Sequence, residues 1–318
     1  MTVASSPAWT VRLANFILGI KPLFNIMKGR ARSMMINRAE EMGVLWRSEA
    51  ANLQSMDWLA DFEAVNNPSL VYPEYYLKPF HAYDNGNLGW EPATEVELAA
   101  YAVHARIWEP QSVEGDPKLR ESFNQVLRSA LPGGVQSIVD LGCSVGMSTF
   151  ALQDTFPGST LTGVDLSPYF LAVARHRSRL RQSDKGNGLQ IPDRPSAQTP
   201  PTWVHAAAES TGLEAGNYDL VAACLVFHEL PRDAALAILQ EAKRLVKPGG
   251  MVAIMDMNPQ SAVFAKMPPY VLTLLKSTEP YLDQYFGVDL VQEFERLGFS
   301  QVRSMENSPR HRTVIATR

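Results

Sequence analysis

The chain has 318 residues, of which 46% are hydrophobic and 19% charged, a composition that excludes a largely disordered, collagen-like or coiled-coil protein. Two cysteines and no C-x-x-C pair exclude a disulfide scaffold and argue against a structural zinc site. The net charge of −4 gives no general case for nucleic-acid binding, and no apolar run reaches the ~18–20 residues that span a bilayer.

The basic residues are concentrated at the start of the chain. Residues 1–38 carry six basic side chains and no acidic one, so the remaining 23 basic and 33 acidic residues sum to −10. Three interpretations are open for residues 9–38: a helix packed on the rest of the protein, a basic helix lying on an anionic membrane surface, or an organelle transit peptide. We expect a cytoplasmic protein that could also associate with a membrane, with organelle targeting left open.

The first part of the chain predicts helices separated by loops. Apolar residues at three- and four-residue spacing predict a helix over 34–66, and a stretch rich in Pro, Tyr, Gly and Asn predicts loops over 67–92. Two more helices are predicted over 93–108, with Thr94 as N-cap, and over 116–131.

After Gly134 the pattern alternates between strands and helices. Strands are predicted at 137–142, 160–166, 202–207, 218–227 and 251–257, and helices at 147–156, 167–181 and 231–246. Residues 298–318 predict two closing strands joined by a turn, and residues 182–201 a polar surface loop. Such alternation predicts an α/β fold with a parallel sheet covered by helices on both faces.

The most informative segment is Ile138–Thr149, IVDLGCSVGMST, where a buried strand runs through a glycine turn into a helix. Gly142 allows a sharp turn, and Gly146 allows close approach to the free N–H groups of the helix N-terminus. Asp165 ends the next strand, where a carboxylate is placed to hydrogen-bond a ribose across the crevice. Together these features predict a nucleoside-binding site.

Two other classes of enzyme share parts of this segment. A dinucleotide-binding dehydrogenase needs G-x-G-x-x-G, but Ser144 and Met147 replace the later glycines, and Asp140 would repel a pyrophosphate. The run Gly142-Cys143-Ser144-Val145-Gly146 also matches the nucleophile elbow of an α/β serine hydrolase, with His228 following later. The hydrolase interpretation leaves Asp165 unexplained.

Residues 137–257 resemble the class I S-adenosylmethionine-dependent methyltransferases. The resemblance rests on VDLGCSVGMST, TGVDLS, YDLVAACLVFHEL and RLVKPGGMVAIMD, and the closing strands extend it to the C-terminus. The sequence is most similar to the ubiquinone/menaquinone and sterol C-methyltransferase type. The resemblance implies a Rossmann-like seven-stranded sheet with a reversed C-terminal hairpin, a helical N-terminal extension and an inserted cap.

The same resemblance implies how the chain is divided. Residues 1–130 would form the N-terminal extension and lid, with the lid at 76–90. Residues 131–318 would form the methyltransferase domain that binds S-adenosylmethionine, and its insertion 259–290 would cap the acceptor. Because that insertion is apolar and aromatic, we expect a small, hydrophobic acceptor such as a quinone, terpenoid or lipid-like molecule.

The resemblance also implies residue roles. Asp140 would face the donor's amino group, Asp165 would hold the ribose hydroxyls, and His228 would act as a general base if the acceptor is a hydroxyl or an acidic carbon. The full set of expected cofactor-binding residues is Asp140, Gly142, Cys143, Ser144, Gly146, Asp165, Leu166, Ala208, Glu209, Cys224 and Leu225.

The remaining expectations are negative or open. The scattered histidines form no ligand set, so no metal is expected, and no nucleic-acid partner is expected either. A protein that binds S-adenosylmethionine without catalysis remains a second alternative. The acceptor, the methylated atom and the oligomeric state are not predicted.

Overall fold

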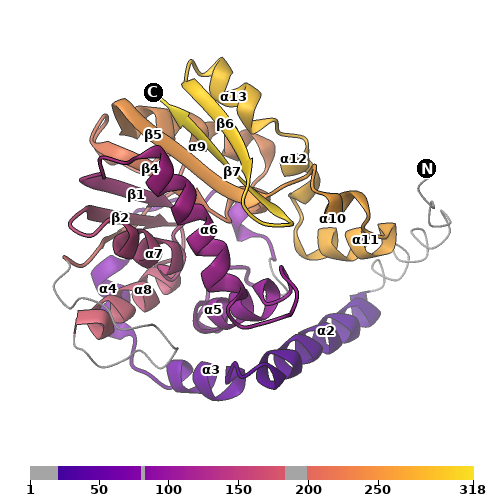
Figure 1. The fold of residues 1–318 in the computed structure, drawn as a ribbon. Helices are drawn as coiled ribbons and strands as arrows, with labels where there is room; N and C mark the ends of the chain where they lie inside the picture. Colours follow the sequence, from indigo (N-terminus) through magenta and orange to yellow (C-terminus); the bar gives the residue numbers. More distant parts are fainter. Residues whose placement is uncertain (1–20, 80–82, 183–198) are drawn as a thin grey trace.

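The computed structural model describes residues 21–79, 83–182 and 199–318, and its centre is a seven-stranded sheet (Figure 1). The strands are β1 Ser137–Leu141, β2 Thr160–Asp165, β3 Thr202–His205, β4 Tyr218–Cys224, β5 Val246–Met257, β6 Ser300–Glu306 and β7 His311–Thr317. Their order is β3-β2-β1-β4-β5-β7-β6, with β7 antiparallel to both of its neighbours. The predicted Rossmann-like sheet with a reversed hairpin is confirmed.

Helices cover both faces of the sheet, as Figure 1 shows. On one face lie α6 (Gly115–Ala130) and α7 (Met147–Thr155). They pack on every second residue of β1, β4 and β5, among them Ile138 and Leu220. On the other, α9 (Arg232–Leu245) and α13 (Leu290–Arg296) cover Val139 and Val221. The central strands β1, β4 and β5 are mainly apolar on both faces because both are buried.

The strand order determines where a ligand can bind. β1 is followed in the chain by β2 on one side, while its other neighbour is β4. The connections therefore leave the sheet in opposite directions at β1, and in open α/β sheets ligands bind outside the carboxyl ends of the strands at such a point, here β1 and β4.

The N-terminal region differs from the predicted single helix over 34–66. It forms α2 (Lys21–Glu41), α3 (Trp46–Gln54) and α4 (Leu59–Val65). The predicted helix is first interrupted at Gly43. Its φ of +92° is not helical, so α2 ends before it, and the amide of Val44 donates to the carbonyl of Ala39. None of the helices within the described ranges is both long and apolar enough to cross a bilayer.

The predicted loop over 67–92 contains a short 3-10 helix, η1 (Glu74–Leu77), and ends where α5 (Trp90–His104) begins. The prediction that Thr94 caps this helix was wrong, because Gly89 is the N-cap and the Thr94 hydroxyl donates within the helix to the Trp90 carbonyl at 2.8 Å. At α8 (Pro168–Gln182), in contrast, the Ser167 hydroxyl caps the helix and accepts from the amide of Phe170. Most of the predicted loop at 182–201 lies outside the described residues.

The inserted segment 259–290 is helical, with α10 Ala262–Ala265, α11 Pro269–Thr278 and α12 Leu282–Phe286. Tyr285 is fully buried and donates its hydroxyl to the carbonyl of Met257 at 2.7 Å. The insertion is thereby held against the carboxyl end of β5.

A buried ion pair joins the N-terminal helices to the sheet domain. Glu97 of α5 pairs with Arg177 of α8, and their exposed fractions are 5% and 6%. Burial raises the pKa of Glu97, and the charge of Arg177 opposes that shift.

We predict that Arg177→Met lowers the free energy of unfolding by about 3–5 kcal/mol, because it leaves the buried carboxyl group of Glu97 without its charged partner. The double variant Glu97→Leu/Arg177→Met should recover most of the loss. Urea unfolding at pH 7 measures both, and a single variant that loses less than about 1 kcal/mol would contradict the argument.

Candidate functional site

Two glycines hold the turn that follows β1. Gly142 and Gly146 have φ of +73° and +89°, where other residues are strained. A Cβ at Gly142 would lie 2.6 Å from the Val226 side chain, and one at Gly146 would lie 2.8 Å from Trp203 and 2.9 Å from Phe150. Both positions therefore need glycine for conformation and for space.

One carboxylate ties this loop to the end of β2. Asp165 accepts a hydrogen bond from the backbone amide of Ser144 on one oxygen and from that of Ser167 on the other, each at 2.8 Å. The residue is 8% exposed, and burial raises the pKa of its carboxyl group to about 6. The loop and this acid lie side by side at the carboxyl edge of the sheet.

Asp140, at the carboxyl end of β1, is fully buried beneath the first turn of α7. Its Oδ2 accepts from the hydroxyls of Ser148 and Thr149 at 2.6 and 2.7 Å, whereas Oδ1 has no partner. Burial raises the pKa of Asp140 to about 6, although both hydroxyls oppose the shift. The unpaired oxygen can accept from an ammonium group placed at this crevice.

Arg120 belongs to no motif in the sequence, but α6 brings it to the same place. Its Nε and Nη2 donate to the two carboxylate oxygens of Asp116 at 2.8 and 3.2 Å, while Nη2 also lies 3.6 Å from Met147 Sδ and Nη1 lies 3.7 Å from Cys224 Sγ. Sulfur accepts hydrogen bonds weakly, so Nη1 lacks a strong acceptor. Nothing in the sequence around Arg120 indicates this position, because α6 precedes the glycine loop and reaches it only through tertiary packing.

Glu209 lies beyond the end of β3. Its Oε1 accepts from the Tyr75 hydroxyl at 2.8 Å, and its buried Oε2 has no partner. The neighbouring Ala208 and, after β2, Leu166 are buried, at 9% and 7% exposure. The three residues predicted to surround the adenine are therefore grouped by β2 and β3.

Both cysteines are free and buried. Cys143 packs toward Gly163 of β2, and Cys224 ends β4 beside Leu225, whose φ is +60°. Burial raises the pKa of both thiols, that of Cys224 to about 12, so neither is a reactive thiolate at neutral pH.

His228 follows β4 in the short helix η2 (Phe227–Glu229) and pairs with Asp256 of β5. Its Nδ1 lies 2.8 Å from Asp256 Oδ1, and both residues are buried. Burial alone would lower the pKa of His228, but the charge of Asp256 outweighs it and raises that pKa to about 10. The imidazole is therefore protonated at neutral pH, and the predicted base role would require the pair to lose a proton first.

The turn around Ser144 lacks the hydrogen bond to a base that the nucleophile of a serine hydrolase needs. Ser144 has a φ of +51°, which such an elbow shares, but its buried Oγ has no hydrogen-bond partner. Since the nucleophile of a serine hydrolase is hydrogen-bonded to a base, Ser144 is not poised for attack.

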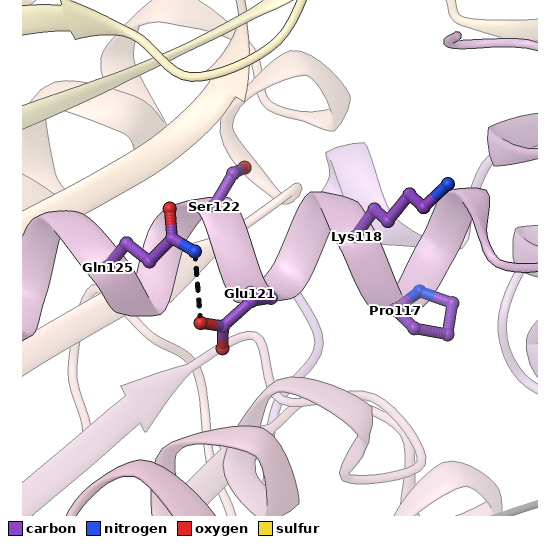
Figure 2. Close-up of a pocket in the computed structure, with 5 residues that line it drawn as sticks. All are labelled: Pro117, Lys118, Glu121, Ser122 and Gln125. Atoms are coloured by element: carbon purple, nitrogen blue, oxygen red, sulfur yellow. Dashed lines mark hydrogen bonds between the residues drawn. The ribbon is translucent and has the colours of Figure 1, made fainter. Parts of the chain in front are cut away.

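Within residues 21–79, 83–182 and 199–318, no group of three or more His, Cys, Asp or Glu side chains could hold a metal ion. A surface pocket lies on the outer side of α6, where Gln125 donates to Glu121 at 3.2 Å (Figure 2). Its lining residues, Pro117, Lys118, Glu121, Ser122 and Gln125, are separate from those of the crevice.

Comparison with known proteins decides between the enzyme classes. Residues 139–254 match a family described as "Methyltransferase domain". The chain contains a methyltransferase domain and is an S-adenosylmethionine-dependent methyltransferase. This methyltransferase is 29% identical over 188 residues to an uncharacterised methyltransferase of Synechocystis sp., covering 58% of this chain and 76% of the relative.

A second relative is a ubiquinone biosynthesis O-methyltransferase of Xanthomonas campestris pv. campestris, 28% identical over 59% of this chain and 74% of its own length. Among solved structures, the CurJ carbon methyltransferase shares the fold, with a TM-score of 0.50 and 14% identity over 72% of this chain. The methyltransferase spans 59% of the length of that protein.

The crevice fits S-adenosylmethionine, whose sulfonium supplies an activated methyl group. Three buried oxygens lack partners there: Asp140 Oδ1, Ser144 Oγ and Glu209 Oε2. We infer that Asp140 meets the donor's ammonium, Arg120 its carboxylate and Asp165 its ribose. The glycines would leave room for the methionine part.

We predict that Arg120→Lys weakens binding of S-adenosylhomocysteine by about 10- to 100-fold, because a point charge replaces a planar guanidinium that can bind a carboxylate through two N–H groups. Methylthioadenosine has no amino-acid part, so its affinity should not change. Calorimetry with both ligands measures the two effects on the same folded protein. Equal losses for both ligands would show that Arg120 does not bind the carboxylate.

Proposed function

We propose that the methyltransferase transfers the methyl group to a phenolic oxygen of a small, mainly apolar molecule. The observation that carries this proposal is the His228–Asp256 pair at the carboxyl ends of β4 and β5, beside the inserted helices. The name of the ubiquinone biosynthesis O-methyltransferases, which are similar over more than half of this chain, also supports an oxygen acceptor.

The inserted helices supply the apolar character of the acceptor site. α12 packs against η2, the turn that carries His228. The rings of Phe264 and Phe286 meet edge to face at 73°, with their centroids 5.2 Å apart, and Tyr285 packs on Phe286. Side chains of this kind exclude water and favour an apolar ligand.

A protonated His228 suits a phenolic acceptor. A cation beside a phenol favours its ionised form and lowers its pKa from about 10. The phenol's proton then leaves to solvent, and the oxyanion forms the new bond to the methyl carbon while the carbon–sulfur bond breaks and its electrons remain on sulfur. His228 holds the oxyanion, and Asp256 keeps the imidazole charged and oriented.

We predict that His228→Gln lowers the rate of methylation of a prenylated catechol at pH 7 by about 100-fold, because the oxyanion loses its cation. The loss should shrink as the pH approaches 10, where the phenol ionises unaided. The pH profile of kcat/KM with a labelled donor measures this, and mass spectrometry identifies the methyl ether. An equal loss at every pH would indicate only a structural role, and a C-methylated product would contradict an oxygen acceptor.

We also propose that the N-terminal segment contacts an anionic membrane, which suits an apolar acceptor. α2 has no acidic side chain before Glu40, and its Arg30, Met34 and Arg38 are exposed. Deleting residues 1–33 should abolish sedimentation with vesicles rich in phosphatidylglycerol and leave donor affinity unchanged. Full vesicle binding by the truncated protein would contradict this.

A further inference from the structure

The guanidinium of Arg120 is held along one edge by Asp116, four residues earlier in α6. Nε and Nη2 donate to the two carboxylate oxygens at 2.8 and 3.2 Å, and such a paired contact fixes the plane of the guanidinium. Nη1 takes no part in this pairing. It lies 3.7 Å from Cys224 Sγ, a weak acceptor, so one end of a charged group that is otherwise fixed stays available to a ligand.

A second side chain fixes Asp116 in turn. His104, the last residue of α5, places its Nδ1 2.7 Å from Asp116 Oδ1. Asp116 is 2% exposed and lies in the first turn of α6, where the helix dipole favours a negative charge. Burial alone would raise the pKa of Asp116, but Arg120 and His104 hold that pKa well below its ordinary value. The carboxylate that holds Arg120 is therefore charged at neutral pH.

The backbone brings α5 and α6 together at this point. Gly115 begins α6, and a Cβ there would overlap with the carbonyl group of His104. Glycine at this position therefore lets the first turn of α6 approach the end of α5, which places Asp116 within hydrogen-bonding distance of His104. These residues all precede 139–254, the part of the chain that matches the methyltransferase family.

We propose that Asp116 is a positioning residue for the methyl donor: it holds Arg120 so that Nη1 meets the carboxylate of S-adenosylmethionine, and His104 orients Asp116. The inference rests on the donor placement given above. A free arginine side chain has many rotamers, and fixing one of them when a ligand binds weakens the binding. Asp116 fixes that rotamer before the donor arrives. Because its negative charge also repels a second carboxylate, an aspartate that did not position Arg120 would hinder the donor.

The test measures the affinities of the full chain for S-adenosylhomocysteine and methylthioadenosine by calorimetry. We expect Asp116→Asn to weaken binding of S-adenosylhomocysteine about three- to tenfold and to leave that of methylthioadenosine, which has no amino-acid part, unchanged. His104→Phe keeps the charge of Asp116 and removes its hydrogen bond, so we expect a smaller loss with the same ligand preference. This variant provides the test if Asp116→Asn does not fold.

The matched control is Asp219→Asn. That carboxylate pairs with Lys247 at 2.7 Å near the amino end of β4, at the opposite edge of the sheet, so its replacement should change neither affinity. A loss of both ligands in Asp116→Asn, equal in size, would show that Asp116 supports the fold and does not position Arg120.

A double variant shows whether Asp116 acts through Arg120. Arg120→Gln should weaken binding of S-adenosylhomocysteine, and adding Asp116→Asn should cause no further loss, because no guanidinium is left to position. If Arg120→Gln binds as well as the unaltered protein, the donor placement itself is wrong. If Arg120→Gln weakens binding while Asp116→Asn leaves it unchanged or tightens it, Arg120 binds the donor but Asp116 does not position it.

Discussion

The buried carboxylate of Asp165 is the constraint on which the donor site depends. It accepts from the glycine loop through Ser144 and from the start of α8 through Ser167, so one side chain positions the ends of two neighbouring strands. Burial raises its pKa to about 6, which means that the fold retains a charge that water would solvate better. A ligand that hydrogen-bonds to this carboxylate recovers part of that cost on binding.

Other buried polar groups near Asp165 lack hydrogen-bond partners that a ligand could supply. Asp140 and Glu209 each keep one buried oxygen without a partner, and Nη1 of Arg120, whose Nε and Nη2 bind Asp116, meets only the sulfur of Cys224. A packed protein rarely leaves several buried polar groups unsatisfied at one place. Their grouping is what a preorganised site for a zwitterionic donor requires, because the groups that will hold the ligand are already in position.

The acceptor side presents a positive charge, in contrast to the acidic groups of the donor side. His228 is held as a cation by Asp256, and aromatic residues of the inserted helices lie beside it. The donor side gathers unpaired acceptors with a single arginine, whereas the acceptor side presents a positive charge at an apolar boundary. Methyl transfer from a sulfonium needs alignment and exclusion of water more than proton transfer, and this division provides both.

The sequence by itself determined the alternation of strands and helices, the glycine turn and the acid at the end of β2. These features depend on local patterns: apolar runs, the special conformations of Gly142 and Gly146, and the position of Asp165 at a strand end. The break of the first predicted helix at Gly43 was not anticipated, because a single glycine within a periodic pattern can be tolerated in a helix.

Only the tertiary structure decided which distant side chains meet at the crevice. Arg120 reaches it from a helix before the glycine loop, Tyr75 reaches Glu209 from a segment expected to be loop, and His228 after β4 pairs with Asp256 of the neighbouring strand β5. No periodicity encodes these contacts, since each depends on how separate elements pack. The charge of His228 likewise follows from one buried neighbour 28 residues away in the chain.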